Sequence, residues 1–453
     1  MVVCGRGIAV AAAVVVGGCF NPGGSVDGGA TPATSESSSV ATNADSSTDP
    51  PALTSTSAPT SSDETCGTAC GTDPDTGVGP GTDPVTGTST GTGPNPGTSS
   101  DSGSEGTEST DTTDPLVNPP VTFVAQDETF SGANALATID LDGDPTLEVV
   151  VTSIKNSNLG VVFDGAGIVK PFMTSSAQAV LTVDLAGGMF EEVALGVTAN
   201  PGQIWSYYGG MSDTIVNGPT INLPGVCTTP ISMATGLLDD DAQPDLVVAC
   251  KEGGTNLFVF QGNADAFMPS MTLALSVSAV SVGLFDVRGD ESLDLVVVSG
   301  AGVSVYEGDK TLMFPGDPDQ TVPAPAARGV AAGEFHGDGY LDLAVVQPSG
   351  LAALTFKGSG ADLAGGEAYG CTSSPQDVQV VDLNADMLDD LVLVETDRVS
   401  VGFNAGGGAF SPPVQLGPVT TGWRVAVGDY SGDGKPDIAA TSNDTVTLYI
   451  QQP

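Results

Sequence analysis

Short apolar runs recur along residues 121–453 and predict many short strands. One kind of run begins with an acidic residue and continues with β-branched side chains, as in Asp294-Leu-Val-Val-Val and Asp390-Leu-Val-Leu-Val. Such a run, apolar at successive positions, indicates a strand that is buried on both faces. An apolar or alternating run precedes it, as at residues 280–285 and 425–428, and a third run ends on an aromatic residue such as Tyr306. The pattern therefore predicts small antiparallel sheets built from hairpins.

These runs repeat with a regular period, and each period contains one acidic turn. The first positions of the turns are Asp140, Asp184, Leu237, Asp286, Glu334, Asp382 and Asp429. They lie 44 to 53 residues apart and divide the region into seven units. Repeats of this size are typical of solenoids and propellers.

The two ends of the repeat region are complementary. The segment after Asp429 is long enough for a turn and two strands, and the segment before Asp140 contains the strand-like residues 121–124. We expect this N-terminal strand to complete the last sheet and close a ring, which removes open sheet edges. The predicted fold is all-β: a seven-bladed β-propeller over residues 121–453, closed by an N-terminal strand completing the last blade and preceded by a disordered linker.

Residues 19–120 have a different composition from the repeats. Ser, Thr, Gly, Pro and Asp dominate, and between residues 21 and 120 there are 14 acidic residues and no Lys or Arg. No apolar periodicity interrupts this segment. Low hydrophobicity with charge of one sign predicts a disordered spacer.

Residues 1–18 have the features of an export signal. Arg6 is followed by an apolar run over residues 8–16 that is too short to span a bilayer. Val16-Gly17-Gly18-Cys19 resembles the lipobox of bacterial lipoproteins, which implies that Cys19 is the lipidated first mature residue. The alternative is an ordinary cleaved signal followed by an unrelated cysteine. We expect an exported protein, lipid-anchored to the bacterial outer membrane or cell surface.

Export would allow disulfides among the remaining cysteines. Cys66 and Cys70 are close enough in sequence for a small local loop. Cys227 and Cys250 could pair within one repeat, although sequence alone does not fix connectivity. Cys371 would then remain as a buried thiol.

Charge and composition exclude several classes of function. The chain has 11 Lys and Arg against 55 Asp and Glu, a formal net charge of −44, so it offers no basic surface to nucleic acid. Its one histidine, His336, would have to serve any Ser-His-Asp relay or histidine-based zinc site. The 61 Gly and 32 Pro favour turns over long helices.

Three acidic turns carry oxygen side chains at positions 1, 3, 5 and 9. These residues are Asp140, Asp142, Asp144 and Glu148; Asp382, Asn384, Asp386 and Asp390; and Asp429, Ser431, Asp433 and Asp437. Alternate oxygens on a tight turn converge and form the hard, multi-oxygen ligand set that Ca²⁺ prefers. We expect Ca²⁺ in a structural role at these turns.

Three further turns keep part of this set and are further candidate Ca²⁺ sites. Their acidic residues are Asp239, Asp241 and Asp245; Asp286, Asp290 and Asp294; and Glu334, Asp338 and Asp342. Arg288 and His336 take position 3 in the last two turns, and the second turn, Asp184 to Glu192, lacks its middle ligands and is expected to be metal-free. The alternative is that Asp and Gly are simply good turn formers. Clustered carboxylates without a cation would, however, repel one another.

The seventh unit resembles the FG-GAP/VCBS repeat family, the integrin-alpha-like seven-bladed β-propellers. The segment that carries the resemblance is Val425-Ala-Val-Gly-Asp-Tyr-Ser-Gly-Asp-Gly-Lys-Pro-Asp-Ile-Ala-Ala. Weaker copies extend the resemblance over residues 121–453. It implies calcium in the loops between strands and use as an extracellular binding or adhesion module.

The predicted function is therefore that of a monomeric, membrane-anchored, calcium-binding propeller that binds a protein or glycan ligand and is not an enzyme. One alternative is a carbohydrate-active enzyme resembling a polysaccharide lyase, and another is a purely structural envelope protein. Trp205, Tyr207 and Tyr208, and Trp423 with Arg424, could form a sugar-stacking surface. Packing between blades is the alternative for these side chains.

Overall fold

The computed structural model describes residues 121–153, 155, 159–163, 169–173, 176–185, 191–210, 215–251, 256–263 and 266–453. The predicted export signal, the predicted lipidation at Cys19, the predicted linker and the cysteines at 66 and 70 concern residues outside this described part. The described part contains 28 strands and a single 3₁₀ turn, η1 (Pro348–Gly350). No helix in that part is both long enough and apolar enough to cross a membrane.

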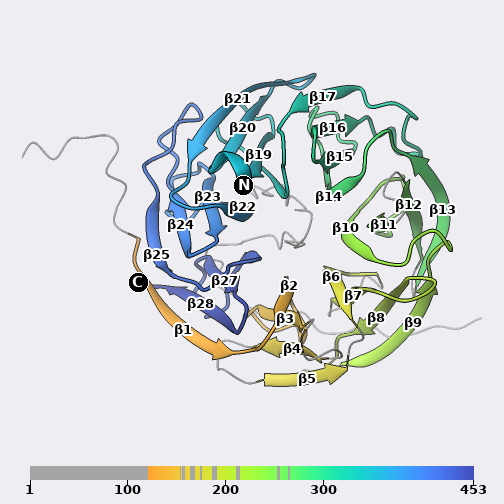
Figure 1. Ribbon diagram of the computed structural model, residues 1–453, viewed down its shortest axis with the longest axis horizontal. Coiled ribbons are helices and arrows are strands. Elements are labelled where there is room, and N and C mark those ends of the chain that lie inside the picture. The colour runs from red at the N-terminus through yellow and green to blue at the C-terminus, as the bar shows by residue number, and fades with distance from the viewer. Residues whose placement is uncertain are drawn as a thin grey trace, which may run out of the picture. The chain divides into compact units, whose positions relative to one another are not determined.

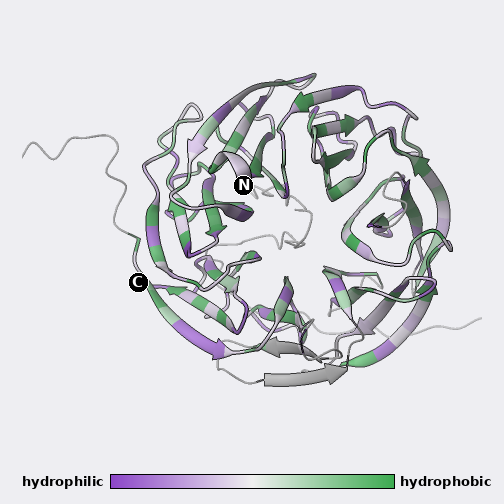
Figure 2. Cartoon of the chain, viewed as in Figure 1, coloured by the Kyte–Doolittle hydropathy of each residue, from purple (hydrophilic) through white to green (hydrophobic). Residues whose placement is uncertain are grey.

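The strands form seven four-stranded antiparallel sheets arranged around a ring, so the expected all-β propeller is confirmed. In Figure 1 the strands that begin the repeats, such as β2 (Ala133–Ile139) and β14 (Ala279–Phe285), lie nearest the middle of the ring, and the outermost strand of each sheet forms the rim. Figure 2 shows apolar residues concentrated on the inner strands of the sheets.

Six of the sheets are built from four consecutive strands each. Sheets one to three are β2 (Ala133–Ile139), β3 (Glu148–Ser153), β4 (Leu159–Phe163), β5 (Val169–Met173); β6 (Ala177–Val183), β7 (Glu192–Val197), β8 (Gln203–Tyr208), β9 (Val216–Asn222); β10 (Pro230–Gly236), β11 (Asp245–Cys250), β12 (Asn256–Asn263), β13 (Ala266–Ala274). Sheets four to six are β14 (Ala279–Phe285), β15 (Asp294–Ser299), β16 (Gly302–Tyr306), β17 (Gln320–Pro323); β18 (Val330–Gly333), β19 (Asp342–Gln347), β20 (Ala352–Gly358), β21 (Leu363–Gly370); β22 (Pro375–Val381), β23 (Asp390–Glu395), β24 (Arg398–Gly402), β25 (Val414–Pro418).

The seventh sheet joins the two ends of the repeat region. It combines β26 (Val425–Gly428), β27 (Asp437–Thr441) and β28 (Thr445–Gln451) with the N-terminal strand β1 (Phe123–Thr129). β1 pairs with β28 along its whole length, from Phe123 opposite Gln451 to Thr129 opposite Thr445. The closing strand thus begins slightly later than the sequence pattern predicted and continues further. Leu136 and Val149 of the first sheet share an apolar cluster with Leu448 of the last, which seals the ring.

The second strand of every sheet begins at the predicted acidic residue. All residues of β3, β7, β11, β15, β23 and β27 are buried, as their uninterrupted apolar runs indicate. Valines of β15 and β19, including Val296 and Val345, belong to one cluster that fills the space between neighbouring sheets. Fourth strands such as β9 and β25 are largely exposed. Burial therefore decreases from the middle of the ring to its rim.

The cysteines of the third repeat form a disulfide. Cys227, in the loop before β10, is bonded to Cys250 at the end of β11, with a Cα–Cα distance of 5.5 Å. Both residues are buried. Cys371 is a free thiol but only half-buried, so the expectation of a buried residue is met in part.

Candidate functional site

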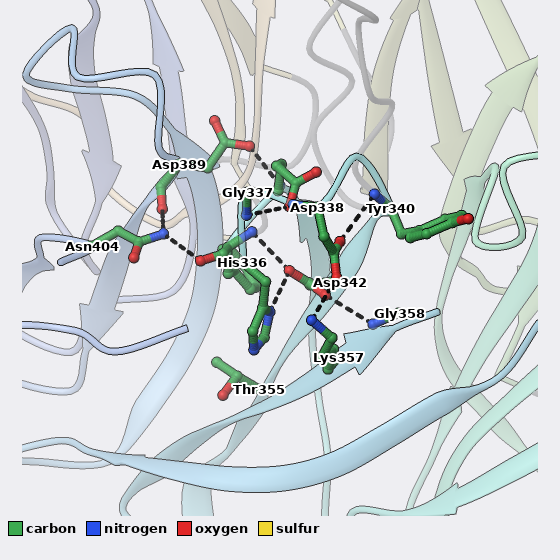
Figure 3. Close-up of polar contacts among 12 residues, drawn as sticks. His336, Gly337, Asp338, Tyr340, Asp342, Thr355, Lys357, Gly358, Asp389 and Asn404 are labelled. Atoms are coloured by element: carbon green, nitrogen blue, oxygen red, sulfur yellow. Dashed lines mark hydrogen bonds and ion pairs between the residues drawn. The ribbon is translucent and has the colours of Figure 1, made fainter. Parts of the chain in front are cut away.

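Five of the acidic turns share one internal arrangement, which Figure 3 shows for the fifth turn. The carboxylate of Asp342, the first residue of β19, accepts a hydrogen bond from the backbone N–H of Phe335 at 2.7 Å with Oδ2. Its Oδ1 accepts one from the N–H of Gly358, at the end of β20, at 2.8 Å. A Cβ at Gly358 would lie 2.0 Å from the carbonyl oxygen of Leu341, so only glycine fits there. The position-9 carboxylate therefore fastens the turn to the third strand.

The same double acceptor recurs wherever position 9 is aspartate. The residues are Asp245, Asp294, Asp342, Asp390 and Asp437, and each accepts one N–H from the turn and one from the end of the third strand. All five are fully buried. These residues were predicted as metal ligands, and the structure gives them a structural role that needs no ion.

The first turn differs because position 9 is glutamate. Glu148 accepts the N–H of Leu141 at 2.8 Å, and one oxygen each of Asp142, Asp144 and Glu148 lie within 4.8 Å of one another. Asp140 is the fourth predicted ligand, and its Oδ1 accepts the N–H of Gly143 at 2.7 Å. Within the described residues, this is the one place where three acidic side chains converge so closely.

The carboxylates of the first turn are held in an unfavourable electrostatic environment. The pKa of Glu148 is raised to about 8, chiefly by burial and also by the charges of Asp142, Asp144 and Asp140, against the lowering effect of the Leu141 N–H. Burial likewise raises the pKa of Asp140. A hard divalent cation would relieve this repulsion, and the donor set of carboxylate oxygens fits Ca²⁺.

Basic side chains contact the carboxylates of the fourth and fifth turns. Arg288 lies 3.3 Å from Asp294 and 2.8 Å from Glu307. In the fifth turn, His336 Nδ1 lies 2.8 Å from Asp342 Oδ2, and Lys357 Nζ forms an ion pair with Asp338 (Figure 3). Glu334 accepts backbone N–H groups of its own turn, including Gly337 at 2.8 Å. These two turns therefore carry positive charge from side chains.

The third turn uses an amide instead of a charged group. Gln261 Nε2 donates to Asp239 at 3.0 Å and to Asp241 at 3.4 Å. Gln261, Glu307 and Lys357 occupy the same place, between the aromatic residue and the glycine that end the third strand. Sequence reasoning missed all three, although the aromatic-X-Gly pattern marks the position.

The sixth and seventh turns are organised by backbone hydrogen bonds. Asp382 accepts the N–H groups of Asp386 at 3.2 Å and Met387 at 2.8 Å, and Asn384 Nδ2 donates to Asp386 at 2.9 Å. In the same way, Asp429 accepts from Asp433 at 3.1 Å and from Gly434 at 2.8 Å.

Neither turn brings three carboxylates together as closely as the first turn does. In the seventh turn the N–H of Ser431 instead donates to Asp437 at 2.9 Å. In the fourth turn, Asp286 and Asp290 likewise belong to a network in which the N–H of Asp290 donates to Asp286 at 3.0 Å. Residues 186–190, most of the second turn, lie outside the described residues, so the expectation that this turn lacks metal stays a prediction.

Two acidic residues at position 8 connect neighbouring sheets and were also missed. Glu191 Oε2 accepts the N–H of Asp140, in the preceding repeat, at 3.0 Å. Asp389 accepts the N–H of Glu334 at 2.8 Å in the equivalent place. Burial raises the pKa of Glu191 to about 7 and that of Asp389 to about 6. The consecutive acidic residues at 191–192 and 389–390 were the sequence signal that could have identified these contacts.

The aromatic candidates separate into two kinds. Tyr207 is buried and belongs to the apolar cluster between the first two sheets, and Trp205 packs against that cluster while its Nε1 donates to Gln203 at 2.9 Å. Trp423 is 39% exposed, and its Nε1 donates to Asn443 at 3.2 Å. Packing therefore accounts for the first group, whereas Trp423 presents its ring to solvent.

Comparison with known proteins supports the fold. Two solved structures of BBS1N in complex with ARL6DN resemble the chain. The one soaked with mercury has 12% identity and a TM-score of 0.55 over 73% of this chain and 97% of that chain. The one soaked with lead has 13% identity and a TM-score of 0.53 over 74% and 98%. No curated protein sequence matches the chain.

The repeat itself is recognised in the sixth and seventh units. Residues 382–440 match the FG-GAP-like repeat, and they run from the sixth acidic turn through most of β27. This segment includes the residues on which the resemblance was based. The chain is thus a β-propeller that carries the FG-GAP-like repeat.

Proposed function

We propose that this protein is a non-catalytic binding module whose ring is stabilised by Ca²⁺ at the first acidic turn. The convergence of Asp142, Asp144 and Glu148 carries this proposal, because three carboxylates so close together favour a divalent cation. When bound, the ion supplies positive charge that fixes the turn between β2 and β3. The predicted sites at the sixth and seventh turns would be weaker, since backbone N–H groups already occupy oxygens of Asp382 and Asp429.

The ligand of such a module is a protein or a glycan presented outside the cytoplasm. A protein ligand is supported by BBS1N, a chain of similar fold that forms a complex with ARL6DN. We further propose that export and lipidation at Cys19 tether the ring to the cell envelope through the linker. A lyase-like enzyme is less well supported, because the sole histidine, His336, is bonded to Asp342 within a turn.

Calorimetric titration of the full chain with CaCl₂, after chelator treatment, tests the metal site. We expect saturable uptake that falls by one ion in the variants Asp144→Asn and Glu148→Gln. Asp338→Asn is the matched control, because Asp338 has the equivalent position 5 in the fifth turn but is paired with Lys357. Unchanged uptake in both first-turn variants would disprove the site.

The binding role is tested on protein and glycan arrays probed with the full chain, with and without Ca²⁺. Reproducible, saturable binding to one class of ligand would support the proposal. An absence of binding to either class, together with turnover of a polysaccharide substrate, would favour the enzyme alternative.

A further inference from the structure

A cavity of about 320 Å³ lies where the first strands begin. Residues of β2, β10, β14 and β22 line it, together with residues of the segments directly before β18 and β26. Six of the seven sheets therefore contribute, which places the cavity at the middle of the ring, where the first strands lie (Figure 1). We call it the axial cavity.

The axial cavity and the acidic turns lie at opposite ends of the ring. The first strands that contribute to the cavity begin beside it and end at their acidic turns, as β2 does between Asn134 and Asp140. The metal sites proposed above are thus separated from the cavity by the length of a strand. A ligand in the cavity would not touch them.

The chemistry of the cavity contrasts with that of the whole protein. Two of the 11 basic residues, Arg328 and Arg424, line it, whereas none of its lining residues is acidic. Asp377 follows the lining residue Gln376 in sequence, is buried, and accepts the N–H of Val425 at 3.2 Å. Even if Asp377 is ionised, two guanidinium groups outnumber it. The cavity therefore offers positive charge in a strongly acidic protein.

The two arginines are held differently. Arg328 Nη1 donates to Gln376 Oε1 at 2.6 Å, and Gln376 Nε2 in turn donates to the carbonyl oxygen of Ser374 at 3.1 Å. This chain of hydrogen bonds orients Arg328. The guanidinium of Arg424 makes no hydrogen bond or ion pair with another described residue, although it is close enough to Asp377 to oppose the effect of burial on the pKa of that carboxyl. Its donors remain available to a ligand.

Neutral groups complete the lining. Ser281 is 3% exposed, and its Oγ has no hydrogen-bond partner in the described part of the chain. Such an unpaired buried hydroxyl is costly unless a ligand or water satisfies it. Asn134 adds an amide group, and Trp423 adds an indole ring that its bond to Asn443 holds in place.

We propose that the axial cavity binds a uronic acid residue of an acidic saccharide, with its carboxylate at Arg328 and Arg424 and its ring against Trp423. Guanidinium groups match carboxylates in geometry and remain charged. The hydroxyl of Ser281 suits a sugar hydroxyl, and so does the amide oxygen of Asn134, whose Nδ2 already donates to the carbonyl oxygens of Ala177 and Gln178. The volume is at the small end for ligand pockets, about 300 to 1,000 Å³, which favours a sugar ring over an extended acidic peptide. The inference deepens the proposed binding role but does not depend on Ca²⁺.

Tryptophan fluorescence of the full chain provides the test. The variant Trp205→Phe leaves Trp423 as the sole tryptophan and is titrated with a galacturonic acid trisaccharide, its methyl ester and neutral galactotriose. We expect a saturable change in Trp423 fluorescence with the acid alone. In the Trp205→Phe background, the further substitution Arg328→Gln or Arg424→Gln should weaken binding of the acid at least tenfold. Equal binding of the acid and its ester would overturn the proposal.

The control is Arg398→Gln, because Arg398 lies outside the cavity and is paired with Asp397 at 2.9 Å. It should bind the acid like the parent. Arg424→Gln leaves Asp377 without its nearby cation and can lose stability, whereas Arg328 is exposed, so unchanged binding in Arg328→Gln alone contradicts the proposal. A hexaglutamate peptide that binds more tightly than the saccharide also contradicts it.

A chelator separates this inference from the proposed calcium-supported function. We expect binding of the acid to persist in chelator if the ring remains folded. If the saccharide does not bind while Ca²⁺ uptake and an array ligand are found, only the axial site is wrong.

Discussion

Asp389 and Glu334 form a reciprocal backbone contact across two neighbouring sheets. The Asp389 carboxylate accepts the Glu334 N–H at 2.8 Å, and the Asp389 N–H donates to the Glu334 carbonyl oxygen at 3.4 Å. Glu191 and Asp140 make the equivalent pair, with both distances at 3.0 Å. Each acidic turn of these pairs is therefore fixed by the next repeat as well as by its own.

Removing the Asp389 carboxylate should destabilise the ring. Asp389→Ala leaves the partly buried Glu334 N–H without its acceptor, which costs about 1 kcal/mol, the lower end of the range for buried groups. We expect a melting temperature lower by a few degrees in differential scanning calorimetry. Glu367→Ala is the control, because Glu367 is exposed on β21. A melting temperature equal to that of the control would show that the contact contributes nothing.

Stability of the metal-free protein should fall as the pH rises. Burial raises the pKa of Glu148 to about 8 and that of Glu191 to about 7, from ordinary values of 4.5. The folded state therefore holds these protons when the unfolded state has lost them, so the stabilisation is complete below pH 4 and is lost between about pH 4.5 and 8. In chelator, we expect the melting temperature to be several degrees higher at pH 5 than at pH 8.5.

Calcium should reduce this pH dependence, because the ion replaces the proton as the partner of the first-turn carboxylates. Calorimetry in millimolar CaCl₂ at both pH values checks the effect. Glu148→Gln should reduce the dependence on both pH and Ca²⁺. A metal-free protein that is more stable at pH 8.5 than at pH 5 would contradict the prediction.

The closing strand should be essential to the ring. Deleting residues 121–129 removes β1 and exposes the edge of β28. We expect the melting temperature to fall by about 5 °C or more, together with a tendency to aggregate. Deletion of residues 110–118, an equal length of the predicted linker, serves as the control. Equal melting temperatures for the two deletions would exclude closure by β1.

The disulfide should stabilise the third sheet. The double variant Cys227→Ser, Cys250→Ser opens a loop with a sequence separation of 23 residues. Loop entropy predicts a loss of about 3 kcal/mol, to be measured by urea denaturation. Cys371→Ser, which breaks no disulfide, should change the free energy of unfolding much less.

Hydrophobic periodicity was sufficient to predict the second strand of every repeat. The second strands begin at Glu148, Glu192, Asp245, Asp294, Asp342, Asp390 and Asp437, as expected. Burial on two faces leaves a continuous apolar run, and an acid at the start of that run is easily recognised. Closure by the N-terminal strand followed from the incomplete unit at each end.

The candidate sites were less predictable, because they depend on side chains that meet across strands. The aligned acidic residues are alike in sequence but differ in their partners. Lys357 forms an ion pair with Asp338 in one turn, and Gln261 donates a hydrogen bond to Asp239 in another. The axial cavity could not be predicted either, since Arg328 and Arg424 are far apart in sequence and line the same cavity only in the folded ring.

The antiparallel course of the strands makes the ring electrically polar along its axis. The acidic turns within the described residues project at one end, whereas Arg328 and Arg424 lie at the other. A disc with this charge distribution experiences a torque near any anionic surface, which turns its acidic end away and its arginine-bearing end inward. Orientation on a polyanion would thus precede specific contact, and it would weaken as salt shortens the Debye length.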